Sequence, residues 1–180
     1  MPPAAAQLDP LQPAAAFYLL GQVEFDTCLA LQQRLVYEAG GRARRQVQVL
    51  VCEHSPLITI GRLGSRAHFR VDQHELDSRG LEVRWINRGG GCVVHGPGQL
   101  AIYPIVTLDR CGWTLGEYLR RLHAALRSLC GELRIQAETP PGRHGVWGRS
   151  GQLAAVGVAV KDWTSYHGLF LNVCQSLDLA

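Results

Sequence analysis

One short stretch of the chain, residues 88–99, carries the residue types best suited to chemistry, and it reads RGGGCVVHGPGQ. Its three consecutive glycines, residues 89–91, are called the glycine loop below. A backbone without side chains lets amide groups approach a ligand oxygen closely. Arg88 and His95 place a fixed cation and a titratable imidazole on either side of these amides. The pattern predicts a cradle for an oxyanion or a carbonyl oxygen, and a tight turn between two strands is the alternative interpretation.

The familiar phosphate-binding patterns do not fit this stretch. It contains neither the G-x-G-x-x-G motif that opens a helix nor the G-x-x-x-x-G-K-[ST] motif. The residues after Gly91 are apolar and predict a strand, which argues against a phosphate site at a helix N-terminus. In the segment that follows, Pro97 stiffens a turn between Gly96 and Gly98, and the two glycines permit close approach to it.

Strands that alternate with helices must position these residues. Patterns of apolar residues predict strands at residues 17–25, 46–54, 57–61, 82–88, 101–108, 133–138 and 165–173, a hairpin of 146–148 and 152–160 turned at 149–151, and a short helix near 72–78. The stretch at 82–88 would deliver Arg88 to the glycine loop, since it ends there.

Two longer helices are expected, each with signals at its ends. Asp26 is a candidate N-cap for the first, and the glycine pair at 40–41 is expected to stop it. Thr114 and Glu117 form a capping box for the second, in which leucines recur at helical spacing. Gly131 is expected to end that helix.

Length and composition indicate one globular domain. The chain has 180 residues, of which 47% are hydrophobic and 18% charged, enough for a core without staples. The formal net charge is +3, and Lys and Arg never form a run longer than two, so no nucleic-acid binding is predicted. We expect a flexible Ala/Pro-rich tail at 1–16 and a single domain at 17–180.

Cysteine usage indicates a reduced, cytoplasmic protein. The six cysteines are scattered, with no C-x-x-C pair and no histidine at the usual metal-ligand spacing, so we expect no metal site. The N-terminal residues lack the basic and continuous apolar regions of a signal peptide. No stretch approaches the roughly 18 apolar residues of a membrane span, and we expect no membrane partner.

Residues 88–99, 54–61 and 145–173 together resemble the lipoyl(octanoyl) transferase family. The first matches its R-G-G-x-x-x-x-H-G-P-G-Q signature, the second its H-x-P-x-x-T-x-G segment, and the third its later strands in order and spacing. Members of the family move an octanoyl chain from acyl carrier protein to a lysine of a lipoyl domain. The related lipoate ligases follow the loop histidine with aspartate, whereas Gly96 follows His95 here, which favours the transferase.

The resemblance implies an α+β fold in which a mixed β-sheet is backed by helices, like the catalytic core of biotin and lipoate protein ligases. It implies no cofactor. The implied partners are octanoyl-acyl carrier protein and the lipoyl domains of 2-oxoacid dehydrogenases and the glycine cleavage H protein. An acyl chain needs an apolar slot with a few polar groups at its end. Carried over position by position, the substrate-binding residues are Arg88, Gly89, Gly90, Gly91, Cys92, Val93, Val94, His95, Ala155, Val156, Gly157, Gly168, Leu169 and Phe170.

The catalytic groups of that family have no matching residues in this sequence. The family's lysine position falls on Gln152 in SGQLAAVG, and no P-C-G motif, which carries the family's cysteine nucleophile, occurs up to Ala180. The catalytic residues are therefore unassigned, and the cysteine lies beyond Ala180 or is absent. Two hypotheses follow: an octanoyltransferase seen incompletely, or a non-catalytic homologue that binds an acyl group or acyl carrier protein. An adenylating lipoate ligase also needs a lysine, so Gln152 argues against it.

Other residues of reactive type have plainer interpretations. Cys92 lies three residues before His95, so the two side chains face opposite sides of a strand, and we interpret Cys92 as a small buried apolar residue. Lys161 is expected in a surface turn. His167 either orients the acyl group or completes the core.

Overall fold

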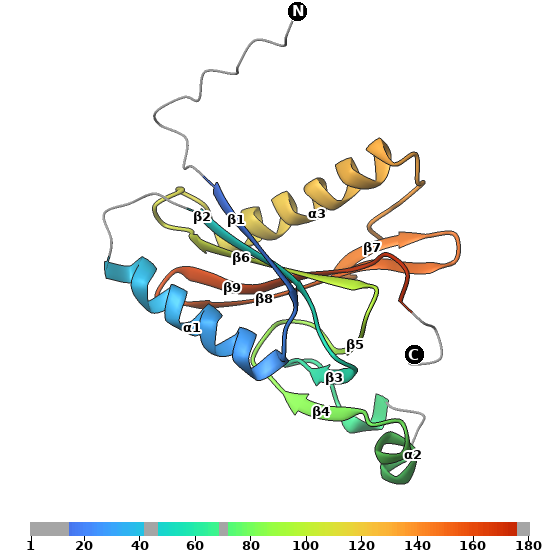
Figure 1. Ribbon diagram of the computed structural model, residues 1–180. Coiled ribbons are helices and arrows are strands. Elements are labelled where there is room, and N and C mark those ends of the chain that lie inside the picture. The colour runs from blue at the N-terminus through green and yellow to red at the C-terminus, as the bar shows by residue number, and fades with distance from the viewer. Residues whose placement is uncertain (1–14, 42–46, 69–71, 176–180) are drawn as a thin grey trace, which may run out of the picture.

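Two β-sheets and two long helices organise the part of the chain that the computed structural model describes, residues 15–41, 47–68 and 72–175 (Figure 1). The large sheet contains, from edge to edge, β1 (Ala15–Gln22), β2 (Val47–Glu53), β6 (Gln99–Thr107), β9 (Thr164–Asn172), β8 (Gly151–Lys161) and β7 (Gly145–Gly148). The small sheet contains β4 (Glu82–Trp85), β3 (Leu57–Ile60) and β5 (Cys92–His95). The helices are α1 (Phe25–Gly41), α2 (Gln73–Ser78) and α3 (Leu115–Glu132), with a 3₁₀ turn at Arg66–His68.

Both sheets are mixed. In the large sheet β1 runs parallel to β2, and the other neighbours are antiparallel. In the small sheet β3 is parallel to β4 and antiparallel to β5. The expected α+β fold of mixed sheet and helices is confirmed, but the sequence did not predict that the strands divide between two sheets.

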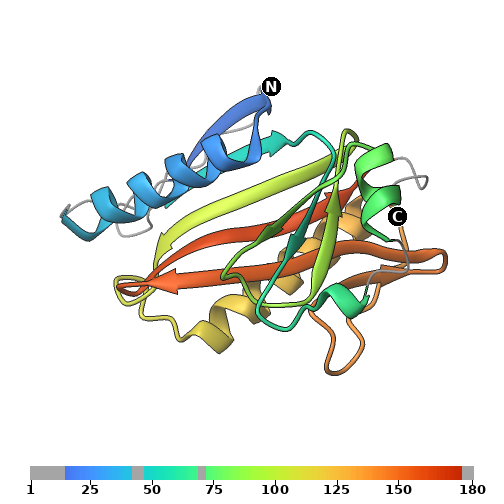
Figure 2. The same cartoon turned by 90° about the horizontal axis from the view of Figure 1, so that it is seen from below.

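The helices cover opposite faces of the large sheet. In Figure 1, α3 lies above the large sheet and α1 below it, and the small sheet lies below as well. Seen from below, the strands of the small sheet cross those of the large sheet (Figure 2). The chain passes from the small sheet to the large one in the turn between β5 and β6, which is the Gly96-Pro97-Gly98 turn.

The face under α3 is a continuous apolar layer. Four residues of α3, each four positions from the next, are buried: Tyr118, Leu122, Leu126 and Cys130. A spacing of four keeps them on one side of the helix, where they pack on Val146, Ala154, Val156, Val158 and Leu169 of the sheet. The layer under α1 is separate and contains Cys28, Leu50, Cys52, Ala101, Tyr103 and Phe170.

The ends of α3 follow the sequence signals only in part. Thr114 is the N-cap, and its Oγ1 accepts a hydrogen bond of 3.2 Å from the Glu117 amide. The Glu117 carboxylate accepts from Arg121 at 2.8 Å, so its side chain pairs along the helix. The helix continues through Gly131, because the amides of Leu133 and Arg134 close the last turn.

The structure also differs from the expected elements at residues 133–138 and at the start of α1. Residues 133–138 form no strand, since Leu133 caps α3 and Arg134 has a left-handed φ of 58°. The first turn of α1 is capped by Glu24, whose Oε2 accepts from the Thr27 amide at 3.0 Å, and the expected cap Asp26 instead bonds Arg84. Of the expected tail, residues 1–14 lie outside the described part, and residues 15–16 belong to β1.

No helix in the described ranges is both long enough and apolar enough to cross a membrane.

The N-cap of α3 is a testable source of stability. Replacing Thr114→Ala removes the side-chain oxygen that accepts from the Glu117 amide and should lower the free energy of unfolding by about 1 kcal/mol. Ser128→Ala on the exposed side of α3 is the matched control and should change stability by less than about 0.5 kcal/mol. Urea unfolding of both variants checks the result. Equal losses in the two variants would contradict the capping role.

Candidate functional site

The glycine loop joins β4 to β5 and lies against an open edge of the large sheet. β7 pairs with β8 only as far as Ala155, and beyond it the Val156 amide donates to the His144 carbonyl at 3.2 Å. No described strand pairs with that edge of β8 further along. The Gly89 amide donates to the Val158 carbonyl of this edge at 2.8 Å. This hydrogen bond links the loop of the small sheet to β8 of the large sheet, so it fixes the loop where the two sheets meet.

The other polar groups of the loop divide into engaged carbonyls and free amides. The carbonyls of Arg88, Gly90 and Gly91 accept hydrogen bonds of 3.0 Å from residues 61–63, just after β3. Among the described residues, the amides of Gly90 and Gly91 donate no backbone hydrogen bond. Two adjacent main-chain donors therefore have no backbone partner in the described structure, and their use by a ligand stays a prediction.

Two glycines allow the loop to adopt this position. Gly90 has a φ of +83°, in the left-handed region where side chains are strained. Gly157 faces the loop from β8, and a Cβ there would lie 2.7 Å from the Gly89 carbonyl oxygen and 3.1 Å from Cδ of Arg88. The sheet can approach the loop so closely only because residue 157 has no side chain.

A pocket of about 260 Å³, called the apolar pocket below, opens beside Gly89 and Gly90 of the loop. Its walls come from the loop, from β8, from the start of α3 and from the residues after β3. It is lined by Arg62, Leu63, Gly89, Gly90, Leu115, Leu119, His144, Val156, Gly157 and Val158. Four of the residues proposed from the sequence meet here: Gly89, Gly90, Val156 and Gly157. The α3 leucines were missed because their helical spacing fits a core face equally well.

The Arg88 side chain turns away from solvent into the space between the sheets. It is 1% exposed, and its Nη2 donates to the carbonyl oxygen and to Oγ1 of Thr59, at 3.0 and 2.8 Å. Its Nη1 donates to the Gly89 carbonyl at 2.9 Å, and its guanidinium carbon lies 5.6 Å from the centre of the Phe170 ring. Burial lowers the pKa of Arg88 to about 10, so the group remains a cation at neutral pH.

His95 is buried in the same layer and uses both ring nitrogens. Its Nδ1 lies 2.7 Å from Oε1 of Gln99, and its Nε2 lies 2.8 Å from Oγ1 of Thr59. The amide oxygen of Gln99 can only accept, so Nδ1 carries the proton and Nε2 accepts from the Thr59 hydroxyl. That hydroxyl in turn accepts from Arg88. The hydrogen bonds therefore run in one direction, from Arg88 to Thr59, from Thr59 to His95 and from His95 to Gln99, and they keep the imidazole neutral and fix its orientation.

The imidazoles of His95 and His167 are both neutral at neutral pH, because their pKa values are lowered. Burial, followed by the nearby charges of His54 and Arg88, lowers the pKa of His95 to about 3. Burial, followed by Arg88, also lowers the pKa of His167 to about 3. In the described structure neither ring nitrogen of His167 has a hydrogen-bond partner, and its backbone has a φ of 54°. His167 thus lies in the core, and a contact with an acyl group stays a prediction.

The remaining proposed site residues lie in the strands around the pocket. Cys92 is half-buried at the start of β5, where its Sγ approaches the Ser65 carbonyl at 3.6 Å. Val93, Ala155 and Phe170 pack in the layer under α1, Val94 packs in the small sheet against α2, and Leu169 packs under α3. Gly168 lies against β6, where a Cβ would meet the Ile102 carbonyl. None of these residues lines the apolar pocket, so their role in substrate binding stays a prediction.

Gln152, at the position where the resemblance places a lysine, is exposed near the start of β8. Its Nε2 donates to the Ala154 carbonyl at 3.3 Å, so its side chain folds back onto its own strand. It supplies no charge to the apolar pocket. None of the six cysteines, all free thiols, lines that pocket either.

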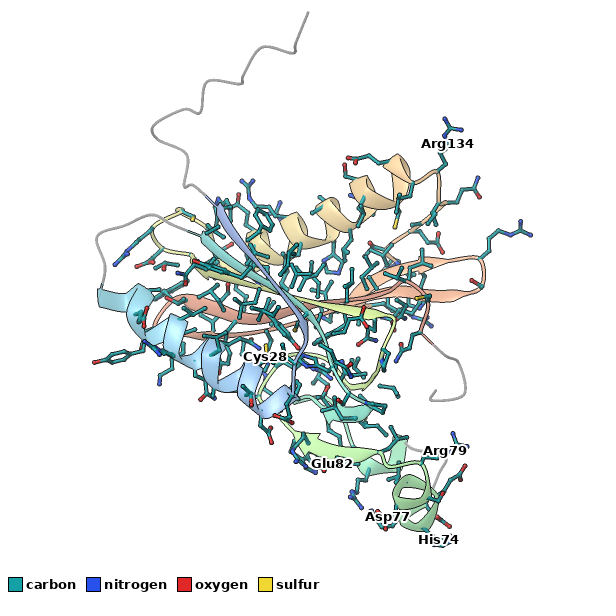
Figure 3. The ribbon with its side chains drawn as sticks, viewed as in Figure 1. Cys28, His74, Asp77, Arg79, Glu82 and Arg134 are labelled. Carbon is teal, nitrogen blue, oxygen red and sulfur yellow. The ribbon has the colours of Figure 1, made fainter. Side chains whose placement is uncertain are left out.

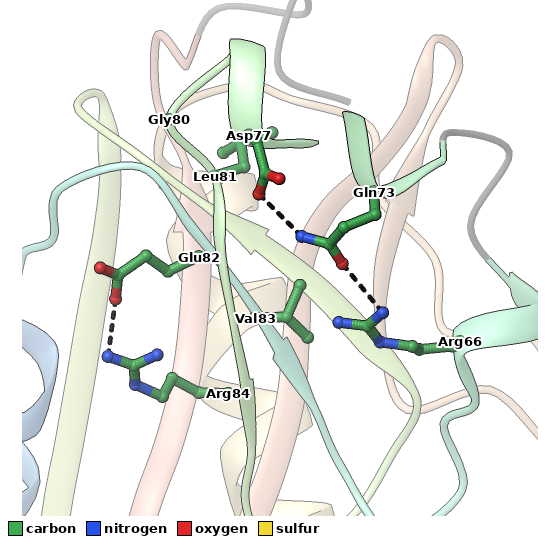
Figure 4. Close-up of a pocket in the computed structure, with 8 residues that line it drawn as sticks. All are labelled: Arg66, Gln73, Asp77, Gly80, Leu81, Glu82, Val83 and Arg84. Carbon is green, nitrogen blue, oxygen red and sulfur yellow. Dashed lines mark hydrogen bonds and ion pairs between the residues drawn. The ribbon is translucent and has the colours of Figure 1, made fainter. Parts of the chain in front are cut away.

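A second hollow of about 520 Å³ lies on the outer side of the small sheet and is polar (Figure 4). Its charged groups pair with one another: Arg66 donates to Gln73, Gln73 donates to Asp77, and Arg84 lies 2.6 Å from Glu82. The lining of this hollow is more polar than apolar, with Leu81 and Val83 as its apolar side chains. The pocket at the glycine loop is therefore the better candidate for an acyl group.

Known proteins with similar sequences and folds were identified. The family model described as the lipoyl protein ligase A/B catalytic domain matches residues 25–180. Octanoyltransferases from Geotalea uraniireducens (strain Rf4) and Geobacter metallireducens are 41% and 42% identical to the chain, and each match covers 88% of this chain and 70% of the relative. A crystal structure of lipoate-protein ligase A bound with ATP has a TM-score of 0.71 at 16% identity, covering 92% of this chain and 69% of that one. The ligase likeness supports the fold alone.

The shared hydroxyl of Thr59 can be tested by paired substitutions. Thr59→Val keeps the shape but leaves Nε2 of His95 without a donor and Arg88 with one acceptor fewer, so we expect the free energy of unfolding to fall by about 1–3 kcal/mol. Thr59→Ser keeps the hydroxyl and loses one methyl group, which costs about 0.8 kcal/mol. Denaturant unfolding of the two variants measures the difference in their free energies of unfolding. A valine variant as stable as the serine variant would contradict the hydrogen-bond chain.

The buried histidines His54, His95 and His167 predict how stability changes with pH, because burial lowers the pKa of all three. The folded pKa of His95 and of His167, about 3, lies below the unfolded value of about 6.5, so between these values the unfolded chain binds protons that the folded chain does not. The free energy of unfolding should fall as pH drops below about 6.5, by up to about 1.4 kcal/mol per pH unit for each histidine. Chemical unfolding at several pH values measures this slope.

Histidine variants test which side chain causes this pH dependence of the free energy of unfolding. His167→Leu removes the proton that His167 binds on unfolding and should make the decline in the free energy of unfolding between pH 6 and pH 4 shallower by up to about 1.4 kcal/mol per unit. His74→Gln changes an exposed histidine of α2 and should leave the slope as in the unmodified chain. A slope that is the same in all three proteins would rule out His167 as a contributor.

Proposed function

Because the chain belongs to the lipoyl protein ligase A/B catalytic domain family, we propose that it is an octanoyltransferase. The reaction moves an octanoyl group from acyl carrier protein to the side-chain amine of a lysine in a lipoyl domain. The observation that carries the proposal is the apolar pocket, because Gly90 lines it and the Gly90 amide has no backbone partner among the described residues, with the Gly91 amide next to it in the chain. An octanoyl thioester has the matching shape, an apolar tail with one polar carbonyl at its head.

The loop is suited to the charge that develops in this reaction. The acyl carbon loses its bond to sulfur and gains a bond to the lysine nitrogen, and a proton passes from that nitrogen to the departing thiol. Negative charge gathers on the carbonyl oxygen in the tetrahedral intermediate, and fixed donors at that point lower the barrier. The amides of Gly90 and Gly91 are such donors. The Arg88 cation, bonded to the Gly89 carbonyl, makes the potential around them more positive.

Gln152 favours a second candidate function. An ammonium group beside a thiol favours the thiolate that attacks a thioester, and a neutral amide cannot do so. A chain with this site intact and no such cation would bind an octanoyl group or acyl carrier protein without turnover. The two candidates share the apolar pocket and differ in whether the acyl group leaves it.

The partners and the compartment follow from the proposed reaction. The donor would be octanoyl-acyl carrier protein, and the acceptors would be lipoyl domains of 2-oxoacid dehydrogenases or the glycine cleavage H protein. We infer a cytoplasmic setting because all six cysteines are free thiols, which reducing compartments maintain.

A transfer assay separates the two candidates. The protein is incubated with octanoyl-acyl carrier protein and a lipoyl domain, and intact mass reports octanoyl on the domain and on the protein itself. Octanoylated lipoyl domain is the expected result. Acyl binding with neither product nor acyl-enzyme would instead support the non-catalytic function. In that case Gln152→Lys alone should not create turnover unless a nucleophile is also present.

Two leucine-to-glutamate substitutions, one at each end of α3, test whether the octanoyl chain binds in the apolar pocket. Leu115→Glu places a carboxylate at the edge of the apolar pocket, and we expect kcat/KM, or acyl affinity if there is no turnover, to fall about tenfold or more. Leu133→Glu at the far end of α3 changes an exposed leucine outside the pocket and serves as the control. Equal effects of the two substitutions would show that the octanoyl chain binds elsewhere.

A further inference from the structure

Two cysteines and a histidine meet in the layer between α1 and the large sheet. Cys28 comes from α1, Cys52 from β2, and His54 follows β2 by one residue. Figure 3 labels Cys28 where α1 faces the sheet. All three side chains are at most 2% exposed, and their ligand atoms lie within 4.8 Å of one another. Neither the proposed acyl transfer nor the hydrogen-bond chain of Arg88 uses any of them.

The spacing of these atoms approaches that around a tetrahedral zinc ion. With Zn–S distances of about 2.3 Å and Zn–N distances of about 2.0–2.1 Å, tetrahedral angles place two sulfurs about 3.8 Å apart and a sulfur and a nitrogen about 3.6 Å apart. The two Sγ atoms are 3.8 Å apart, and Sγ of Cys52 is 3.6 Å from Nε2 of His54. Two distances have to change on binding: the one between Cys28 and His54, at most 4.8 Å, has to shorten, and the Tyr103 hydroxyl, 2.8 Å from Nε2 of His54, has to move out to about 3.3 Å.

The histidine is already oriented as a ligand. Nδ1 of His54 lies 2.7 Å from the Val23 carbonyl, which can only accept, so Nδ1 carries the proton. The lone pair of Nε2 therefore accepts from the Tyr103 hydroxyl at 2.8 Å, with Sγ of Cys52 3.6 Å away, and a bound ion would take the place of that hydroxyl proton. A carbonyl bonded to the second ring nitrogen is the arrangement that fixes metal-binding histidines in proteins. Burial also lowers the pKa of His54, which keeps the ring neutral.

A fourth donor and a balance of charge complete the site. The Tyr103 hydroxyl lies 2.8 Å from Nε2 of His54 and is buried with it. Two thiolates neutralise one divalent cation, and the imidazole and the phenol are neutral, so the assembled group has no net charge. A neutral group is the one that an apolar interior tolerates. Nε2 of Gln32, 3.8 Å from Sγ of Cys28, adds a hydrogen bond to the first sulfur.

We propose that Cys28, Cys52, His54 and Tyr103 form a structural zinc site that ties α1 to the large sheet. On binding, each thiol loses its proton to solvent and forms a Zn–S bond, while the phenol keeps its proton and no group is oxidised or reduced. Because the ligand atoms are buried, the ion enters as the chain folds. The spacing C-x₂₃-C-x-H matches no common zinc motif, so the sequence did not reveal the site.

Metal analysis of the whole chain tests the site. The protein is unfolded with a chelator and refolded with zinc or with cobalt. We expect one ion per chain, thiolate-to-cobalt charge-transfer absorption, and the ligand-field bands of a tetrahedral ion. X-ray absorption of the zinc form should show two sulfur neighbours. An ion bound only by oxygen and nitrogen, or no retained ion, would overturn the proposal.

Variants identify the ligands. Cys28→Ala and Cys52→Val should each weaken zinc binding by at least about 100-fold, because loss of a ligand exceeds the 10- to 100-fold cost of losing a supporting contact. Cys130→Val changes a buried cysteine under α3 and should bind zinc as the unmodified chain does. Zinc binding unchanged in both ligand variants would overturn the proposal. If a ligand variant fails to refold, the spectra of the unmodified chain decide.

A disulfide is the competing fate of the two sulfurs. If the mass of the unmodified chain is lower by two hydrogens and a digest contains a peptide pair linked through Cys28 and Cys52, the two cysteines form a disulfide, and the proposal is overturned. Two free thiols after zinc removal, and their protection from alkylation when zinc is bound, are the results expected for the metal site.

Discussion

The structure depends on a buried guanidinium, that of Arg88, which forms no ion pair with a carboxylate of the described residues. Arg88 is held between the sheets by oxygens of Thr59 and Gly89 and by the face of Phe170. Removing a cation from water is costly unless polar groups surround it, so those acceptors cannot be rearranged independently. The Thr59 hydroxyl therefore faces Arg88, the His95 ring is turned toward Thr59, and the glycine loop is drawn to the edge of β8. The position of the free amides is a consequence of where the charge lies.

Much of the fold could be read from the sequence because local signals and tertiary packing agree. The hairpin turned at residues 149–151, the N-cap Thr114 and the strand after the glycine loop occur where they were predicted. The prediction failed where a long-range contact decided the outcome. Residues 133–138 have a strand-like pattern, yet the left-handed Arg134 closes the end of α3 and prevents extension. The separation of β3 into a second sheet was also hidden, because a fully buried strand looks alike in either sheet.

The sequence predicted those features of the candidate site that depend on the main chain. Consecutive glycines and a strand that carries Gly157 specify a close approach, and the structure places them together. The side chains were harder, since a sequence does not say which way a strand faces. His95 lies among core rings with both nitrogens engaged, and Leu119 lines the pocket from a helix more than twenty residues away in the chain. Cys28 and His54 meet only because α1 crosses the end of β2.

The hydrogen bond from Gly89 to Val158 has a further consequence for solubility. An unpaired strand edge is a template on which another chain can add a strand, and such growth leads to aggregates. The glycine loop occupies that edge beyond the end of β7, in the way that a bulge or a covering loop shields other sheets. A ligand that holds the loop in place also keeps the edge covered. Occupancy of the pocket and resistance to self-association are thus linked through one main-chain contact.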